Sequence, residues 1–394
     1  MARVRMGMVG GGEGAFIGEI HRAAARLDGE VELVCGAFSS NPQGSRQTGA
    51  RLGLPVERVY SSWRDMLLQE SRLPEDTRAQ FVSIVTPNDL HCAVASVALE
   101  SGFHVLSEKP ATRTLAEARA LAQAAQRFKR LYALTHTYLG YPLVAEARAR
   151  ITSGEIGTVR RVQVEYPQGW LATPLESMGN RQAQWRTDPQ RAGVGGSVGD
   201  IGVHAFNLAE YVTGLHVTRL CADLGVTVQG RALDDQAAAF LRFDNGAVGL
   251  LSASQVSVGE ENDLNIRVYG ETGGITWSHR DPNSLHILSL NAARRTVRAG
   301  KDAPDLRPAT RAQCRTPAGH PEGYIEAFAN IYRAFAEDVR RFSADGPAAA
   351  VASPASIEAA LRGMAFIEAM VASSAAGQHW VELAGVDCGS ISSE

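Results

Sequence analysis

The chain has little cysteine and no strong charge excess, and it shows neither an internal repeat nor an apolar run long enough to cross a bilayer. Its five cysteines are scattered without a Cys-x-x-Cys pair, so we expect neither a disulfide framework nor a metal site. With 39 basic and 42 acidic residues, the formal net charge is -3, which does not favour nucleic acid or an anionic membrane as a partner. The N-terminus lacks a secretory pattern, and we expect a cytoplasmic protein.

What the chain does have is length and apolar content. Its 394 residues are 45% apolar and 21% charged, enough for more than one hydrophobic core. The sequence pattern changes near Tyr138. We therefore predict two domains, residues 1–137 and 138–394.

Residues 1–137 alternate between strand and helix patterns. Strands are predicted at 4–9, 31–38, 81–85, 104–106 and 132–135, with helices from about residues 17, 90 and 115. The last of these helices begins with a capping-box pattern, Thr114 and Glu117. This alternation predicts an α/β domain with a doubly wound parallel sheet, a Rossmann domain.

A glycine turn follows the first strand, Gly10-Gly11-Gly12-Glu13-Gly14. Glycines admit a dinucleotide pyrophosphate close to the backbone, and a helix N-terminus attracts its charge. Gly10 and Gly12 match the first two glycines of such a turn. The third is Ala15, or Gly18 if residues 14–16 are an insertion. A glycine turn alone is often just a turn, so its context decides.

The end of the second strand does not settle the choice between NAD and NADP. An acidic residue at this point normally holds the adenosine ribose of NAD, but Ser39 and Ser40 stand here, with Arg46 nearby. We expect NAD or NADP, with NAD slightly favoured.

Residues 138–394 show longer alternating strands, at 160–166, 218–228, 236–243, 247–255 and 265–269. Helices are predicted at 142–151, 324–342 and 356–372. This pattern predicts an α+β domain with an open, mainly antiparallel sheet and helices on one face. The seven basic residues of segment 294–315 come with prolines and no apolar period, which predicts a solvated loop.

Asp200 and His204 follow a glycine-rich stretch, Gly193-Val194-Gly195-Gly196. In a helix, residues four apart emerge on one face, so the two form a plausible acid/base pair. The same spacing also fits a surface hydrogen-bonded pair. The glycines predict close approach of the backbone to a ligand or to another domain.

Five motifs in order resemble the Gfo/Idh/MocA family of oxidoreductases, named for glucose-fructose oxidoreductase and inositol 2-dehydrogenase. They are the glycine turn ending in His21, Thr86-Pro87-Asn88 with His91, Glu108-Lys109-Pro110, Gly154-Glu155-Ile156-Gly157, and Gly195-Gly196 ahead of Asp200 and His204. The resemblance implies a nicotinamide cofactor on the Rossmann domain and a second domain that supports a substrate pocket and often an oligomer interface. We therefore expect a homodimer or homotetramer.

By position, Lys109, Asp200 and His204 match the family's catalytic set. His204 suits a general base, Lys109 a positive charge that stabilises the alcohol oxygen, and Asp200 a group that orients one of them. The simpler interpretation of Lys109 is a surface lysine after a strand. Pro110 is expected to follow a cis peptide. The residues expected at the cofactor are Gly10, Gly12, Glu13, Phe16, Ile17, Ser39, Ser40, Arg46, Thr86, Asn88, His91, Glu108 and Lys109.

Aromatic and amide side chains in the second domain favour a carbohydrate, because rings stack on sugar faces and amides bind hydroxyls. Two segments of the second domain carry them, with Tyr166 and Gln184 among their members. His320, in a turn that resembles the anhydrosugar-oxidising branch, is either a pocket residue or a helix cap. The expected substrate residues are Tyr138, Gln168, Trp170, Trp185, Arg186, His204 and His320.

These expectations lead to an NAD(P)-dependent dehydrogenase of a secondary hydroxyl on a sugar, anhydrosugar or cyclitol. Two alternatives use the same fold. One is a redox-neutral glycosidase that oxidises its substrate transiently, and the other is a non-catalytic regulator that senses the cofactor. Retention of Lys109, Asp200 and His204 together argues against the regulator.

Overall fold

The computed structural model describes residues 2–346, 349–350 and 353–383; Cys388 lies outside them. The chain divides into two units, Met1–Thr137 with Tyr324–Leu361, and Tyr138–Gly323 with Arg362–Glu394. Residues 324–361, which the prediction placed in the second domain (138–394), belong to the first unit.

The first unit is built on a parallel sheet. In the described part of the chain it has five strands in the order β2-β1-β3-β4-β5, every neighbouring pair parallel. Their bounds are β1 (Val4–Gly10), β2 (Val31–Ala37), β3 (Phe81–Val85), β4 (His104–Ser107) and β5 (Tyr132–Leu134). The predicted Rossmann sheet is confirmed, and its strand order reverses beside β1, where such sheets bind ligands.

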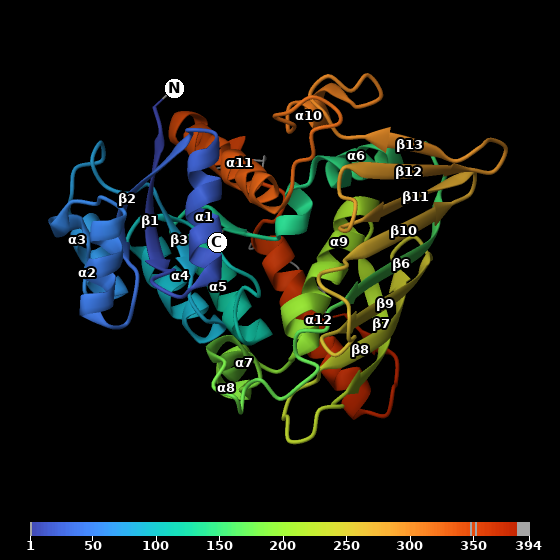
Figure 1. Ribbon diagram of the computed structural model, residues 1–394, viewed down its shortest axis with the longest axis horizontal. Helices are drawn as coiled ribbons and strands as arrows, with labels where there is room; N and C mark the ends of the chain where they lie inside the picture. Colours follow the sequence, from blue (N-terminus) through green and yellow to red (C-terminus); the bar gives the residue numbers. More distant parts are fainter. Residues whose placement is uncertain (1, 347–348, 351–352, 384–394) are drawn as a thin grey trace, which may run out of the picture. The chain divides into compact units, whose positions relative to one another are not determined.

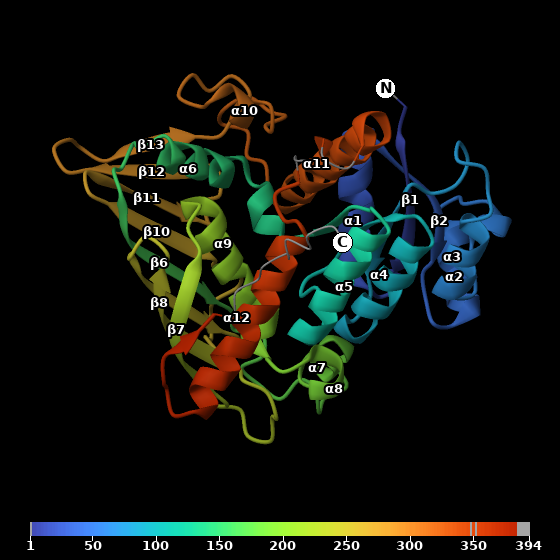
Figure 2. The ribbon, with the colours of Figure 1, turned by 180° about the vertical axis from the view of Figure 1, so that it is seen from behind.

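Helices cover both faces of this sheet. Helix α1 lies in front of it in Figure 1, and α4 and α5 lie in front in the opposite view of Figure 2. The helices are α1 (Phe16–Leu27), α2 (Pro42–Arg51), α3 (Trp63–Glu70), α4 (His91–Glu100) and α5 (Leu115–Arg127), with short 3-10 turns η1 (Val56–Arg58) and η2 (Asn88–Leu90). Thr114 Oγ1 caps α5 by accepting from the amide of Glu117 at 3.2 Å. The Glu117 carboxylate accepts from the amide of Arg113 (3.0 Å), so half of the predicted capping box is present.

Helix α11 (Tyr324–Asp345) packs against α1 and completes the core of the first unit. The rings of Phe81 on β3 and Phe335 on α11 lie 5.2 Å apart, both 1% exposed or less. The sequence placed this helix in the second domain because it follows that domain's strands. Its apolar face instead fills the Rossmann core together with Met6 and Met8 of β1.

The second unit carries a large sheet with nine strands in the part of the chain that the structure describes, in the order β13-β12-β11-β10-β6-β9-β8-β7-β14. Neighbours are antiparallel except for β6 and β9, which confirms the predicted mainly antiparallel sheet. The bounds are β6 (Val159–Pro167), β7 (Val217–Gly225), β8 (Gln236–Phe243), β9 (Val248–Ser254), β10 (Asn265–Gly270), β11 (Gly273–Ser278), β12 (Ser284–Ser289), β13 (Arg295–Arg298) and β14 (Val381–Glu382).

Helices α6 (Pro142–Thr152) and α9 (Val203–Thr213) pack together on one face of this sheet (Figure 1). Helix α12 (Ile357–Ala375), which belongs to this unit from Arg362 onward, stacks Phe366 on Phe206 of α9 with ring centroids 4.4 Å apart. The remaining helical segments are η3 (Thr137–Gly140), α7 (Arg181–Arg186), α8 (Pro189–Ala192), the π-turn η4 (Val198–Gly202) and α10 (Pro308–Arg311).

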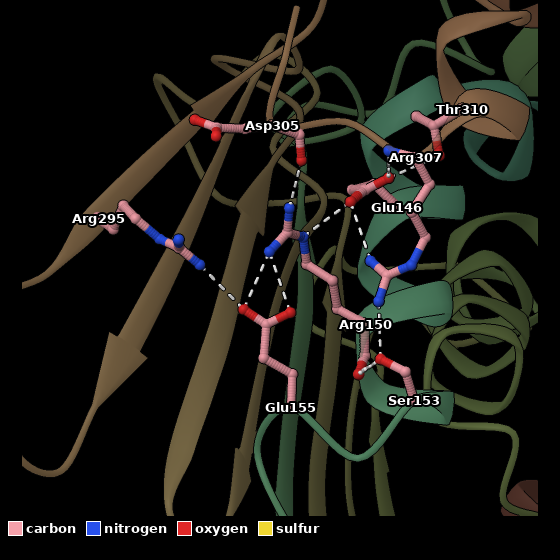
Figure 3. A network of polar contacts seen from close by, with 8 residues as sticks. All are labelled: Glu146, Arg150, Ser153, Glu155, Arg295, Asp305, Arg307 and Thr310. Atoms are coloured by element: carbon pink, nitrogen blue, oxygen red, sulfur yellow. Dashed lines mark hydrogen bonds and ion pairs between the residues drawn. The ribbon is translucent and has the colours of Figure 1, made fainter.

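The prediction of a solvated loop at 294–315 is wrong in part, since residues 295–298 and 308–311 form regular structure. This segment forms the edge strand β13 and the short helix α10, because its arginines pair with acidic side chains of neighbouring elements. Figure 3 shows the centre of these contacts, the fully buried carboxylate of Glu146 on α6. It accepts from Arg150 Nε (2.8 Å), Arg307 Nη1 (3.1 Å) and Thr310 Oγ1 (2.7 Å). A buried charge satisfied in this way fastens the segment to α6.

Among the described residues, no helix is both long enough and apolar enough to cross a membrane.

Candidate functional site

The glycine turn lies at the carboxyl edge of the parallel sheet, between β1 and α1. Gly10 and Gly11 have φ values of +88° and +74°, a region that side chains rarely adopt. The amide of Gly12 donates to the carbonyl of Phe38 at 3.0 Å, which ties the turn to the end of β2. A Cβ atom on Gly12 would lie 2.7 Å from that carbonyl oxygen.

Gly18, rather than Ala15, occupies the position of the third glycine in the dinucleotide-binding turn. A Cβ atom at residue 18 would lie 2.3 Å from Gly11 Cα, so only glycine lets α1 pack this closely on the turn. Residues 14–16 therefore act as an insertion. Ala15 is the N-cap residue and has no side-chain acceptor for the first-turn amides.

A dinucleotide fits these residues. The first turn of α1 offers backbone amides and the positive end of the helix dipole to a pyrophosphate. At the same sheet edge, Thr86 Oγ1 is buried without a hydrogen-bond partner, a polar atom that a ligand hydroxyl or amide would satisfy. Phe16, at the first helical position, is 66% exposed although it is apolar.

Polar residues surround the turn on the side of β2. Asn41 caps α2 and donates its amide to Ser39 Oγ at 3.1 Å, while Ser40 and Arg46 are exposed. Glu13 is exposed and pairs with Arg51 at 3.4 Å. A ribose or a 2′-phosphate would therefore meet hydroxyls and a guanidinium here.

His91 joins the loops that follow β3 and β4. Its ring is fully buried, with Nδ1 2.8 Å from the Pro110 carbonyl and Nε2 2.9 Å from that of Thr86. Burial lowers the pKa of His91, and a neutral imidazole donates to one of these carbonyls only. The ring, expected at the cofactor, connects the two loops through these contacts. Asn88 is also buried.

Glu108 is the most connected acid at this edge. Its Oε1 atom accepts from His21 Nε2 (2.9 Å) and Thr135 Oγ1, and its Oε2 atom lies 3.3 Å from the backbone N of Lys109. Burial acts to raise the pKa of Glu108, but the hydrogen bond and charge of His21 together with Lys109 and Thr135 lower it. Glu108 is therefore a carboxylate at neutral pH. The Lys109–Pro110 peptide is cis, as predicted.

In the second unit, the glycines ahead of Asp200 serve the start of its own helix. A Cβ atom on Gly196 would lie 2.1 Å from the carbonyl oxygen of Asp234. The Asp234 carboxylate accepts from the amides of Gly196 (2.6 Å) and Val198 (2.8 Å) and from Ser197 Oγ (2.6 Å). Of the glycines expected to approach a ligand or another domain, Gly196 packs against Asp234, whose carboxylate lies at the helix N-terminus.

Asp200 and His204 do not lie in one regular α-helix as predicted. Asp200 belongs to the π-turn η4, and His204 lies one residue into α9. Gln255 Nε2 donates to Asp200 Oδ2 at 2.8 Å, and Arg186 Nε lies 3.3 Å from the same oxygen. The ring of His204 meets that of Tyr138 edge to face, with centroids 5.1 Å apart. Both residues are integrated into the unit rather than forming an isolated surface pair.

Amides and rings connect these two residues into one cluster. Gln168 accepts from Gln255 Nε2 (3.4 Å) and from Trp170 Nε1 (3.1 Å), and donates to Tyr166 Oη (3.3 Å). The Tyr166 hydroxyl donates to Asn262 Oδ1 at 3.0 Å and contacts the hydroxyl of Tyr138. Arg186 stacks on the ring of Trp185 at 4.1 Å. Desolvation raises the pKa of Tyr166, which therefore stays a neutral hydroxyl.

This cluster unites most of the substrate residues expected from the sequence, namely Tyr138, Gln168, Trp170, Trp185, Arg186 and His204, with Asp200. His320 is exposed on a turn that Glu322 holds through the amides of Arg315 and Thr316, and the contacts that connect the cluster in the described chain do not include it. Three members were missed: Gln255, Asn262 and His279, whose ring meets that of Tyr138 edge to face with centroids 5.2 Å apart. Gln255 is the last residue of the predicted strand 247–255, a position that could have indicated it. Asn262 and His279 lie in turns that carry no sequence motif.

Together, the parallel sheet with its glycine turn and the second unit with its acid, imidazole and amide cluster define a two-part, dinucleotide-dependent oxidoreductase. Residues 4–136 match the oxidoreductase family with an NAD-binding Rossmann fold, and residues 144–276 match the GFO/IDH/MocA C-terminal domain. The chain belongs to the Gfo/Idh/MocA family and is an NAD(P)-binding oxidoreductase.

Similar proteins cover nearly the whole chain. The uncharacterized oxidoreductase YfiI of Bacillus subtilis is 31% identical, over 96% of each chain. The levoglucosan dehydrogenase of Pseudarthrobacter phenanthrenivorans is 28% identical, over 92% of this chain and 97% of its own. The structure of an inositol dehydrogenase homolog from Azotobacter vinelandii, complexed with NAD+, superposes with a TM-score of 0.91 at 35% identity, over 96% of this chain and 97% of that one.

Proposed function

We propose that the protein oxidises a secondary hydroxyl of a sugar, anhydrosugar or cyclitol with NAD(P)+. The cluster around Asp200 carries this proposal. It combines the rings of Tyr138 and Trp170 with the amides of Gln168 and Gln255, and hydrogen bonds link all four, those of Tyr138 through Tyr166. This combination of aromatic rings and amides suits a substrate ring that bears several hydroxyl groups. The activities named for the relatives, on levoglucosan and on scyllo-inositol, support the same substrate class.

The proposed chemistry assigns one task to each catalytic residue. Gly10, Gly12 and Gly18 would hold the nicotinamide cofactor, which would supply a hydride acceptor for the carbon that carries the hydroxyl. His204 takes the hydroxyl proton as general base, so that the C–O bond becomes a carbonyl. The ammonium of Lys109 stabilises negative charge on the oxygen as that proton leaves.

Asp200 is the positioning carboxylate in this proposal. Gln255 and Arg186 both contact its Oδ2 atom and hold the side chain in one orientation. Its negative charge favours the protonated form of whichever group it orients, the imidazole of His204 or the ammonium of Lys109.

The cofactor is proposed to be NAD, with NADP as the alternative. The NAD+ complex of the Azotobacter vinelandii homolog supports NAD. NADP remains the alternative because the end of β2 carries no carboxylate that would repel a 2′-phosphate; the residues there are Ser39 and Ser40, with Arg46 nearby. Fluorescence titration with NADH and NADPH distinguishes the two, and tighter binding of NADPH would overturn the preference.

We also propose that two or four copies assemble through the large sheet. Phe240 is 57% exposed and Val248 38% exposed on β8 and β9. Beside them is a depression of about 390 Å³ lined by Val164, Ala238 and Leu250 among others. Apolar surface of this kind is typical of a protein–protein interface.

A screen of cyclitols, anhydrosugars and methyl glycosides tests the proposed activity by absorbance at 340 nm. NADH formed in proportion to a ketone product supports a dehydrogenase. Cleavage of a glycoside with catalytic NAD+ and no net NADH would replace it with the redox-neutral glycosidase.

A further inference from the structure

A continuous chain of buried hydrogen bonds runs through the first unit and ends beside Lys109. The Tyr332 hydroxyl lies 2.8 Å from Ser83 Oγ and 2.7 Å from His21 Nδ1, and His21 Nε2 lies 2.9 Å from Glu108 Oε1. Ser83, His21 and Tyr332 are each 1% exposed or less. The chain joins β3, α11 and α1 to the turn that carries the catalytic lysine.

We propose that Tyr332, Ser83 and His21 are positioning residues that hold Glu108, and through it Lys109, in place while His21 gains or loses a proton. This inference rests on the proposed role of Lys109. It adds to that role a hydroxyl from α11, a helix distant in sequence from every motif of the Rossmann domain.

The chain is complete with either form of the His21 ring. With a neutral ring, Ser83 donates to Tyr332, Tyr332 donates to Nδ1, and the Nε2 proton goes to the Glu108 carboxylate. With a protonated ring, Nδ1 donates to the Tyr332 oxygen, whose hydroxyl turns to donate to Ser83 Oγ. In both cases Nε2 keeps donating to Glu108, because a carboxylate only accepts.

The protonation of His21 therefore changes the charge next to Lys109 without breaking a contact. A neutral ring leaves the His21–Glu108 pair at one negative charge, and a protonated ring brings the pair to zero. Glu108 Oε2 lies 3.3 Å from the backbone N of Lys109, so this charge acts on the turn that presents the lysine. In a buried site such a change is weakly screened.

Other titratable and charged groups interact with members of this chain. They are Lys109 from the turn after β4, Arg22 from α1 and His136 from the segment after β5. Glu19, also on α1, interacts with Arg22. Phe328 of α11 covers the His21 ring at 4.9 Å and excludes water from it. The hydroxyl that contacts His21 Nδ1 is that of Tyr332.

Tyr332→Phe tests the proposal, because it removes the hydroxyl and keeps the ring. Tyr60→Phe is its matched control: Tyr60 is another tyrosine of the same unit with a hydrogen-bonded hydroxyl, which donates to the Glu70 carboxylate at 2.9 Å. The first measurement needs no cofactor. The ring resonance of His21, identified by its loss in His21→Gln, is titrated by NMR in each protein.

We expect the His21 titration to move by about half a pH unit or more in Tyr332→Phe and to stay in place in Tyr60→Phe. We also expect kcat to fall roughly tenfold in Tyr332→Phe with little change in the KM for NAD+, and its pH profile to shift. If Tyr332→Phe does not fold, Ser83→Ala shortens the same chain and is measured in its place.

Equal His21 titrations in wild type and Tyr332→Phe would overturn the inference. Lys109→Met separates it from the proposed function. Full activity of Lys109→Met would contradict the assigned role of the lysine and with it this inference, whereas an inactive Lys109→Met beside an unshifted Tyr332→Phe contradicts only the inference.

Discussion

Gly18 on α1 faces Gly11 of the glycine turn so closely that a Cβ atom on Gly18 would lie 2.3 Å from Gly11 Cα. The helix proposed to receive the pyrophosphate can therefore approach the turn only while residue 18 is glycine. Any side chain there must push the turn and the helix apart.

Gly18→Ala should weaken NADH binding roughly tenfold or more, because the amides of the turn and the first helical turn no longer converge on the pyrophosphate. Fluorescence titration measures the affinity, and a melting curve confirms that the variant is folded. Unchanged affinity in a folded variant would show that the contact does not shape the cofactor site.

His204→Ala should lower kcat by a factor of about 100 or more and leave cofactor affinity nearly unchanged, since the ring is proposed to take the substrate proton. The control is His216→Ala, which removes a half-exposed imidazole paired with Glu210 at 3.6 Å just after α9. Steady-state kinetics with a substrate found in the screen provides the measurement. A His204→Ala enzyme as active as the control would exclude the base assignment.

Glu146→Gln should destabilise the second unit by about 3 kcal/mol, because it leaves the guanidinium groups around a fully buried site without their central carboxylate. Glu155→Gln is the comparison: Glu155 also binds Arg150, at 2.9 Å, but its side chain is 28% exposed. It should cost about 1 kcal/mol or less. Denaturant unfolding of both variants measures the loss in the free energy of unfolding. Equal losses in the two variants would mean that burial of the Glu146 charge does not affect stability.

Stability should fall as the pH falls below about 6.5, through three buried histidines of the first unit, His91, His104 and His136. Burial, aided by nearby positive charge, lowers the pKa of His104 and that of His136 to about 3. The unfolded chain takes up these protons near pH 6.5, whereas the folded chain does not. The free energy of unfolding is therefore highest above that pH and drops by about 1.4 kcal/mol per pH unit for each histidine.

His104→Asn should remove about a third of this slope, the share of one histidine in three. An Asn amide oxygen can replace His104 Nδ1, which accepts from the amide of Leu131 at 3.0 Å. The exposed His320, changed to Asn, is the control. Unfolding curves at pH 7.5, 6.5 and 5.5 provide the slopes, and an identical slope in His104→Asn and wild type would contradict the assignment.

Local patterns were enough to predict the Rossmann sheet and the antiparallel sheet, because strand alternation and turns are encoded within short segments. Strand β3 falls at the predicted residues, Phe81–Val85. The relation of His21 to Tyr332 could not be predicted in this way. The two residues are 311 positions apart, and α11 carries an apolar stripe that fits any core.

The site shows the same division. Asp200 and His204 were predicted from spacing and resemblance. The π-turn that holds Asp200 begins at Val198, whose amide donates to Asp234 on a loop distant in sequence, and this could not be predicted. Strands β11 and β12 and the edge strand β13 were missed for a similar reason. The edge strand reads as a run of charges until its arginine partners, such as Glu155, are known.

Transfer of deuterium to the cofactor tests the central claim most directly. A substrate from the screen, labelled with deuterium at the carbon that bears the reacting hydroxyl, is incubated with the enzyme and NAD+, and the nicotinamide is examined by NMR. The proposed function predicts one deuterium at C4 of each NADH formed, and its loss in both Lys109→Met and His204→Ala. NADH without deuterium, or full transfer in both variants, would contradict it.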